Sequence, residues 1–185
     1  MIRNSTTTWG GIAQAFHWIG GALILFLLGH GWWMVAVPPR EMRFAQYGWH
    51  ASIGYALLAL MIARLLWRWL NAVPALPSAA KAWERASARI NHWGLYLLIL
   101  ADAVSGWALA GTFRRPLEGT LFGLRVPNVV SSRDPAVHEL LENSHSALAW
   151  ALAALIVVHF VGAFYHLLVK RDGVMQRMLP SFARR

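Results

Sequence analysis

Histidines are the residues in this chain whose type and spacing could do chemistry. Four of the eight, all inside long apolar segments, match one another in depth: His17, His50, His145 and His159. His145 and His159 are 14 residues apart, which is about four helical turns, so both rings would leave one helix face about 21 Å apart. Because an imidazole in an apolar span must recover the hydration that it loses, each of the four is a candidate functional residue.

The four histidines form two pairs when each is placed by its depth in its segment. His50 and His145 fall toward one end of their segments, which we assign below to the outer face. His17 and His159 fall toward the other end. Imidazole is a common axial ligand of haem iron, and two imidazoles from facing helices can hold one haem between them. Two such pairs would make a transmembrane electron path. With both axial positions filled, the irons would transfer electrons rather than bind oxygen or substrate.

Two other interpretations of the same histidines stay open. A transporter of zinc or another divalent metal could use them, although such sites usually recruit carboxylates and only Asp102 lies deep in an apolar segment. Alternatively, the rings are hydrogen-bonded packing residues, as single histidines in membrane helices often are. His30 lies 13 residues after His17 and should point away from that face, and His138 should lie in a loop. Either would replace His145 if the last helix began elsewhere.

Four apolar segments must position these side chains. They run from about 12–37, 47–70, 90–111 and 145–169. Each has roughly 20 or more residues, enough to cross a hydrocarbon core of about 30 Å at about 1.5 Å per residue. The sequence therefore predicts an all-α, integral membrane four-helix bundle that forms a single domain over residues 1–185.

The composition also favours a membrane protein. Hydrophobic residues make up 57% of the chain and charged residues 14%, whereas a soluble domain carries about a quarter charged residues. The 11 Trp suit a bilayer, where their amphipathic rings collect at headgroup level. The absence of Cys excludes disulfides, Cys-ligated zinc and iron–sulfur clusters. The formal charge of +9 is spread between the apolar segments without a groove-reading motif, so we expect a lipid bilayer and no nucleic acid as partner.

The distribution of Lys and Arg predicts the orientation. With the N-terminus inside, most of the 17 Lys and Arg flank the inner ends of the four segments. The outer side would carry Arg40, Arg43, Arg114, Arg115, Arg125 and Arg133. The positive-inside rule therefore favours both termini in the cytoplasm.

Several stretches in chain order resemble the bacterial cytochrome b561 family, and particularly its di-haem superoxide:ubiquinone oxidoreductase type. They are AFHW (15–18), HASIG (50–54), RLLWR (64–68), HWGLYLL (92–98) and KRDGVMQRMLP (170–180), together with the spacing of His145, His159 and His166. These features cover nearly the whole chain. One departure is in the third segment, which reads ILADAVSGW where relatives often carry a proline, so a kink there is not expected.

The resemblance implies a four-helix bundle with two haems b, whose axial ligands would be His17, His50, His145 and His159. It implies a multi-pass protein of the bacterial inner (cytoplasmic) membrane that passes electrons between a donor at the outer face and ubiquinone. In the superoxide:ubiquinone oxidoreductase type the donor is superoxide, which is oxidised to O2 while ubiquinone is reduced to ubiquinol. The alternative is a non-catalytic cytochrome b subunit that serves a separate dehydrogenase or hydrogenase.

Three further residues are candidates for roles around these cofactors. His166 lies seven residues beyond His159, about 10 Å nearer the cytoplasm, where it could bond or protonate a quinone headgroup or simply reach water. His92 could line the same site or support a haem propionate. Arg64 shares a face with His50 and could pair with a propionate or extend to the headgroups.

Two polar features have a functional and an ordinary interpretation. The basic residues between 112 and 142 could steer an anion such as superoxide toward the outer haem, or could form an ordinary solvated loop. Asp102 could make hydrogen bonds within the bundle or relay protons.

Overall fold

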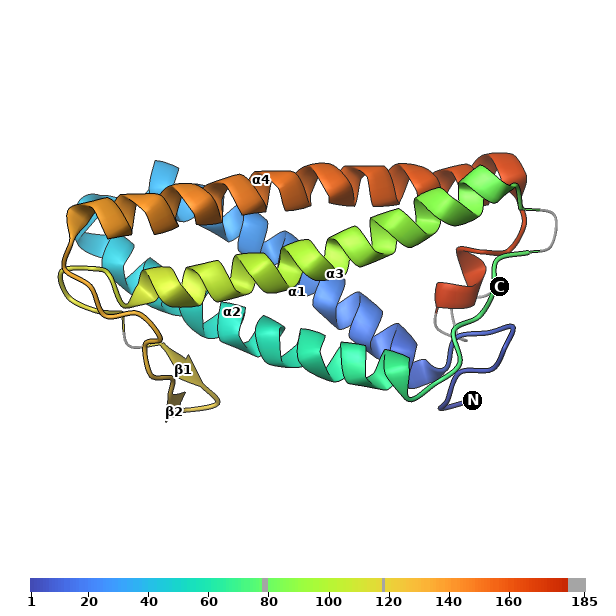
Figure 1. The fold of residues 1–185 in the computed structure, drawn as a ribbon, viewed down its shortest axis with the longest axis horizontal. Helices are drawn as coiled ribbons and strands as arrows, with labels where there is room; N and C mark the ends of the chain where they lie inside the picture. Colours follow the sequence, from blue (N-terminus) through green and yellow to red (C-terminus); the bar gives the residue numbers. More distant parts are fainter. Residues whose placement is uncertain (78–79, 118, 180–185) are drawn as a thin grey trace.

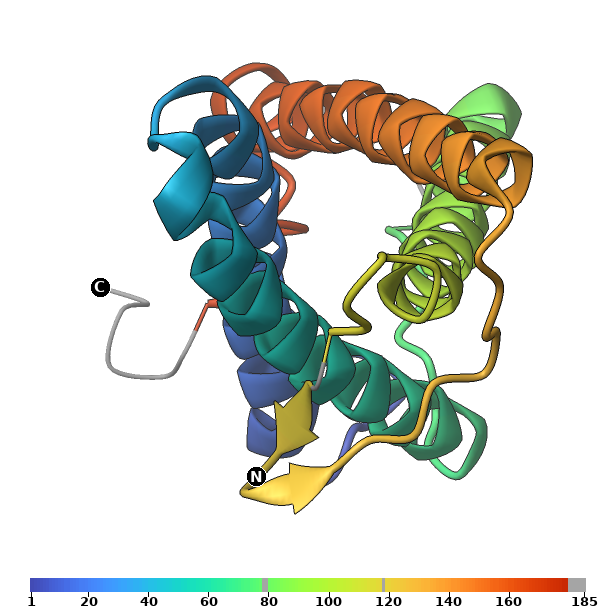
Figure 2. The same ribbon diagram turned by 90° about the vertical axis from the view of Figure 1, so that its left-hand side faces the viewer.

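The computed structural model describes residues 1–77, 80–117 and 119–179. Its main elements are α1 (Gly11–Ala36), α2 (Arg40–Trp69), α3 (Ala82–Ala110) and α4 (Pro135–Phe164). They run along one long axis (Figure 1) and, seen from one end, surround a common centre (Figure 2). Each is long and apolar enough to cross a membrane. The predicted all-α fold with four long apolar helices is therefore confirmed.

The helix ends follow local capping chemistry rather than the limits of the apolar segments. The side chain of Asp134 accepts a hydrogen bond from the N–H of Ala136 at 2.9 Å, and Pro135 opens α4. At the start of α3, the Glu84 carboxylate accepts a bond from the N–H of Lys81 at 2.7 Å. Helices α2, α3 and α4 thus begin before the apolar segments that we predicted for them, because the helical backbone hydrogen bonds extend into the polar residues that precede each segment.

The C-terminal end of α4 changes its helical geometry. A π-helical turn, Tyr165–Lys170 (η1), continues α4, and Arg171 then leaves the helix with a φ of 50°. A short 3₁₀ turn, Gln176–Met178 (η2), follows. The side-chain amide of Gln14 on α1 donates to the carbonyls of Arg177 and Leu179, both at 3.0 Å. The chain after α4 is therefore fastened against the beginning of α1.

A small β-hairpin lies at the opposite end of the bundle (Figure 1). Strands β1 (Thr120–Leu121) and β2 (Leu124–Arg125) are antiparallel, and Phe122 and Gly123 form the turn with φ values of 51° and 82°. Two positive φ values are typical of a tight hairpin turn that matches the strand twist. The N–H of Thr120 donates to Ser52 Oγ at 3.1 Å, which docks the hairpin on α2.

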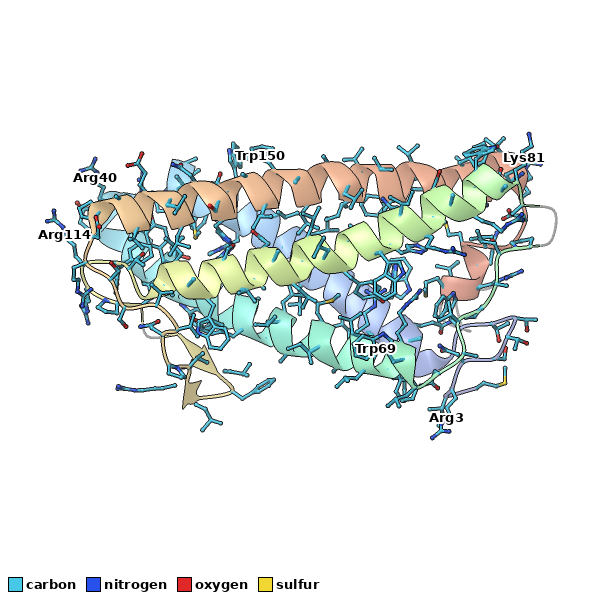
Figure 3. All side chains as sticks on the ribbon, viewed as in Figure 1. Arg3, Arg40, Trp69, Lys81, Arg114 and Trp150 are labelled. Atoms are coloured by element: carbon cyan, nitrogen blue, oxygen red, sulfur yellow. The ribbon has the colours of Figure 1, made fainter. Side chains whose placement is uncertain are left out.

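The middle of the bundle is apolar inside and outside. A buried layer fills its centre, in which Met61 is the most enclosed side chain; its members are Ile24, Leu27, Leu57, Met61, Tyr96, Ile99 and Leu152. Figure 3 shows Trp150 on the outer surface of α4, with Arg40 and Arg114 at one end of the molecule and Arg3 and Lys81 at the other. Charges at both ends and apolar surface between them suit a bundle that crosses a bilayer.

Candidate functional site

The structure brings the four candidate histidines together in the two pairs that their depths predict. His17 on α1 faces His159 on α4 with ring centres 6.0 Å apart. His50 on α2 faces His145 on α4 with ring centres 6.2 Å apart. We call these the inner pair and the outer pair, after the orientation expected from the charges.

The spacing within each pair fits one metal between two rings. Metal–imidazole nitrogen bonds are about 2 Å, so an iron between two such nitrogens places the ring centres about 6 Å apart. The helix packing agrees with this spacing. Among the described residues, close backbone packing runs from α1 to α2, from α2 to α3 and from α3 to α4. The contacts of α4 with His17 on α1 and with His50 on α2 are made by its histidine side chains.

The outer pair has a carboxylate beside it. His145 Nδ1 lies 3.0 Å from Asp102 Oδ1, 3.1 Å from the Asp102 carbonyl oxygen and 3.0 Å from Ser105 Oγ. Ser105 Oγ itself donates to the Asp102 carbonyl at 2.7 Å. The carbonyl and hydroxyl oxygens are positioned as acceptors for the ring N–H, and the carboxylate lies beside it at ion-pair distance. This environment turns Nδ1 toward the protein and leaves Nε2 of His145 for a metal.

The inner pair has an amide in the equivalent position. Asn91, which is buried, accepts a hydrogen bond from His159 Nδ1 with its Oδ1 at 3.2 Å. Its Nδ2 donates to the Leu155 carbonyl at 3.2 Å, so the amide oxygen must face the ring. His159 is thereby held as the tautomer that keeps Nε2 free to bind a metal.

The histidines on α1 and α2 each have a ring nitrogen without a hydrogen-bond partner in the described part of the chain. These atoms are Nδ1 of His17 and Nδ1 of His50, and both are buried. Glycines make room beside two rings: a Cβ at Gly106 would come 3.0 Å from His145 Cε1, and one at Gly31 would come 3.3 Å from His50 Cε1. Glycine therefore permits the backbones of α3 and α1 to approach the outer pair.

Within the described part of the chain, the structure places His92, but not Arg64, in contact with the inner pair. The ring of His92 lies 5.6 Å from that of His159, although the residue as a whole is exposed. The guanidinium of Arg64 lies 5.3 Å from the ring centre of Tyr96. His92 thus lies beside the inner pair, at the place that the sequence predicts.

Two expectations for other histidines are wrong. His30 does not point away from the site: its ring stacks on His50 with centres 5.7 Å apart, and its Nε2 lies 3.1 Å from Gln46 Oε1. His17 contacts His159 on α4 whereas His30 contacts His50 on α2, so a ring that points away from the face of His17 can still lie at the other pair. His138 is in the first turns of α4 rather than in a loop, and its Nδ1 lies 2.8 Å from Thr112 Oγ1.

His166 lies at the inner end, in the π-helical turn. Its Nδ1 donates to Asp172 Oδ2 at 2.7 Å. Burial raises the pKa of the Asp172 carboxyl, but the hydrogen bonds from His166 and from the N–H of Val174 outweigh it and hold the pKa below its ordinary value. The carboxylate thus stays ionised and can orient the ring of His166.

The donor set fits haem better than a bare metal ion. Within the described ranges, no group of three or more His, Asp and Glu side chains is arranged to hold a metal ion. A haem iron needs only two protein ligands, because the porphyrin supplies four nitrogens. Two facing imidazoles whose Nδ1 atoms are buried or bonded to the protein meet that requirement.

Three contributors to the site escaped the sequence analysis: Asn91, Ser105 and Gly106. Asn91 is next to His92 in the stretch that resembles the family, but its neutral side chain carries no signal of its own. Ser105 and Gly106 become meaningful only when α3 is packed on α4.

An apolar four-helix bundle with two facing histidine pairs is the architecture of a membrane cytochrome b. A model of the prokaryotic cytochrome b561 family matches residues 8–181 of this chain. The chain belongs to that family, which implies haem b as cofactor and transmembrane electron transfer as activity.

Curated relatives agree with this assignment. The chain is similar to cytochrome b561 homolog 2 of Escherichia coli (strain K12), with 29% identity over 96% of this chain and 94% of the relative. It is also similar to the probable superoxide oxidase CybB of Yersinia pestis, with 27% identity over 89% of this chain and 92% of the relative.

Proposed function

We propose that this protein oxidises superoxide at the outer face of the bacterial inner membrane and passes the electrons through two haems b to ubiquinone. The observation that carries the proposal is the pair of histidine sites, 6.0 and 6.2 Å between ring centres, at two depths of one bundle. The similarity to a probable superoxide oxidase supports the choice of donor.

The chain's own residues would hold and separate the cofactors. His17 and His159 would bind one iron, and His50 and His145 the other; haem b supplies a one-electron couple at each site. Asn91 and Asp102 fix the rings of the α4 ligands. The apolar layer around Met61 keeps water out of the space between the two sites.

Superoxide would approach at the end that carries the β-hairpin. Arg114 and Arg115 are exposed there, and Arg115 lies 5.4 Å from the ring centre of Phe44. Basic groups at a surface steer small anions toward it. Each superoxide loses one electron and leaves as O2, so two are needed for each quinone.

Ubiquinone would be reduced at the opposite end, near the inner pair. It takes two electrons and two protons to become ubiquinol. His166 and His92 are the candidate quinone residues, and the bond from His166 to Asp172 would orient the ring for a hydrogen bond or proton transfer to the headgroup. Arg64 would hold a propionate of the inner haem.

Optical spectroscopy and a superoxide assay test this function. The purified protein should give a reduced-minus-oxidised spectrum of low-spin haem b, should be reduced by superoxide from a generating system and should turn over with added ubiquinone. A protein without haem b after expression with adequate haem refutes the proposal. A haem-loaded protein that superoxide leaves oxidised, but that a dehydrogenase or hydrogenase reduces, is instead an electron-transfer subunit.

The orientation can be tested separately because the chain has no Cys. Phe122→Cys lies at the tip of the hairpin, 90% exposed, and Ile2→Cys lies near the N-terminus, 70% exposed. With both termini in the cytoplasm, a membrane-impermeant maleimide should label position 122 in intact spheroplasts and position 2 only after lysis. The reverse pattern contradicts the orientation.

A further inference from the structure

The two histidine pairs differ in the charge beside their α4 ligand. On the outer side, Asp102 Oδ1 lies 3.0 Å from the Nδ1 of His145 and makes no hydrogen bond within the described part of the chain. On the inner side, the atom facing the Nδ1 of His159 is the neutral amide oxygen of Asn91, at 3.2 Å. The same ring atom of the same helix thus faces a carboxylate at one depth and an amide at the other.

The side chain of Asp102 is only 17% exposed, so solvent screens it weakly.

The carboxylate acts on reduction through its charge. A ferric haem carries one more positive charge than a ferrous haem, so a nearby carboxylate stabilises the oxidised form. This effect is larger in a membrane interior than in water, because the effective dielectric constant is low. Hydrogen bonding and charge next to an axial ligand are recognised means of setting a haem potential.

We infer that Asp102 lowers the reduction potential of the haem held by His145 below that of the haem held by His159, whose α4 ligand faces the neutral Asn91, so that electrons move from the outer site to the inner site. This inference rests on the proposed haem function and adds to it the residue that makes the transfer downhill. Asp102 acts through His145 and is a positioning and charge-bearing residue rather than a catalytic one.

A potentiometric titration of the haem-loaded protein tests the inference. Asp102→Asn removes the charge and retains the size of the side chain. At a fixed solution potential, we expect the ratio of ferric to ferrous outer haem to fall about tenfold, which corresponds to a rise of about 59 mV in its midpoint potential for a one-electron couple. The inner potential should stay within a fraction of that change. His17→Ala, which should leave only the outer haem, assigns the two potentials.

Ser105→Ala is the matched control. It removes a neutral oxygen that contacts the same Nδ1 atom, so its effect should be less than a third of the effect of Asp102→Asn. An equal or larger shift in Ser105→Ala, or an unchanged potential in a haem-loaded Asp102→Asn, overturns the inference. If Asp102→Asn does not retain haem, the wild-type protein decides: an outer potential equal to or above the inner one refutes the inference. A protein with no bis-histidine haem spectrum would instead refute the proposed function.

Discussion

The outer and inner histidine pairs have similar spacings and different neighbours. Ring centres are 6.2 Å apart in one and 6.0 Å apart in the other, and each uses one α4 histidine. The outer α4 ring faces the carboxylate of Asp102, whereas the inner one faces the amide of Asn91. The comparison teaches that one helix can present the same ligand twice while its partner helix, α3, gives each ligand a different electrostatic setting.

Removing an α4 ligand should have the largest effect and should separate the two sites. We expect His145→Ala to lose the outer haem and His159→Ala the inner haem, because only one of the two protein ligands that hold each haem would remain. Haem content per polypeptide, measured as the pyridine haemochrome, should fall by half in each variant. His30→Ala is the control, since it should retain both haems; loss of haem there would contradict the assignment of His50.

Placing a carboxylate beside the inner α4 ligand, as at the outer site, tests whether the charge at this position sets the potential. Asn91→Asp puts a carboxylate beside His159, and we expect it to lower the inner potential by about 59 mV, equivalent to a tenfold change. Combined with Asp102→Asn, it should reduce or invert the difference between the two haems. Spectroelectrochemistry measures both potentials. A double variant with unchanged potentials would show that the charges at positions 91 and 102 do not set them.

The glycine beside His145 should matter for retention of the outer haem. A Cβ at position 106 would lie 3.0 Å from His145 Cε1, so Gly106→Ala should cost about 1 kcal/mol in overpacking. The expected result is weaker retention of the outer haem, measured by its loss to apomyoglobin. Gly29→Ala is the control because nothing lies within 4 Å of its added Cβ. Equal haem loss in both variants would contradict close packing at position 106.

The smallest effect is expected at the inner end, where no ligand is touched. Asp172→Asn weakens the bond to His166, and the loss of one hydrogen bond should slow quinone reduction about threefold while both haems remain. The lowered pKa of Asp172 gives the pH dependence its sign: the bond from His166 to the ionised carboxylate is present above the ordinary aspartate pKa and is lost as the pH falls through the lowered value. A wild-type rate that is insensitive to acid, or a variant that loses haem, would contradict this role.

The sequence predicted the bundle and the pairing of histidines because both depend on the length of the apolar segments and on where each histidine falls within its segment. Apolar runs of sufficient length define spans, and 14 residues between His145 and His159 return to the same helix face. It did not predict the contacts of Asp102, Asn91 or His30. Those contacts depend on the angle and register at which α1, α3 and α4 pack, which hydrophobic patterning constrains only loosely.

The helix ends were predicted less well for a related reason. Hydropathy marks where the hydrocarbon ends, whereas a helix ends where its backbone groups find other partners. The cap at Asp134 lies beyond the apolar run, so His138 became helical although it follows a polar stretch. Signals for the cap were present in the sequence as Asp134 and Pro135 and could have been used.

The apolar layer around Met61 is a region of low dielectric constant between the two histidine pairs. Each pair would therefore sense a different fraction of the voltage across the membrane. An electron that moves from the outer to the inner site travels through this layer toward the negative side, and a full crossing costs about 2.3 kcal/mol for each 100 mV. On the proposed path, an energised membrane slows the inward transfer and a depolarised one accelerates it, which makes the reaction a reporter of the voltage itself.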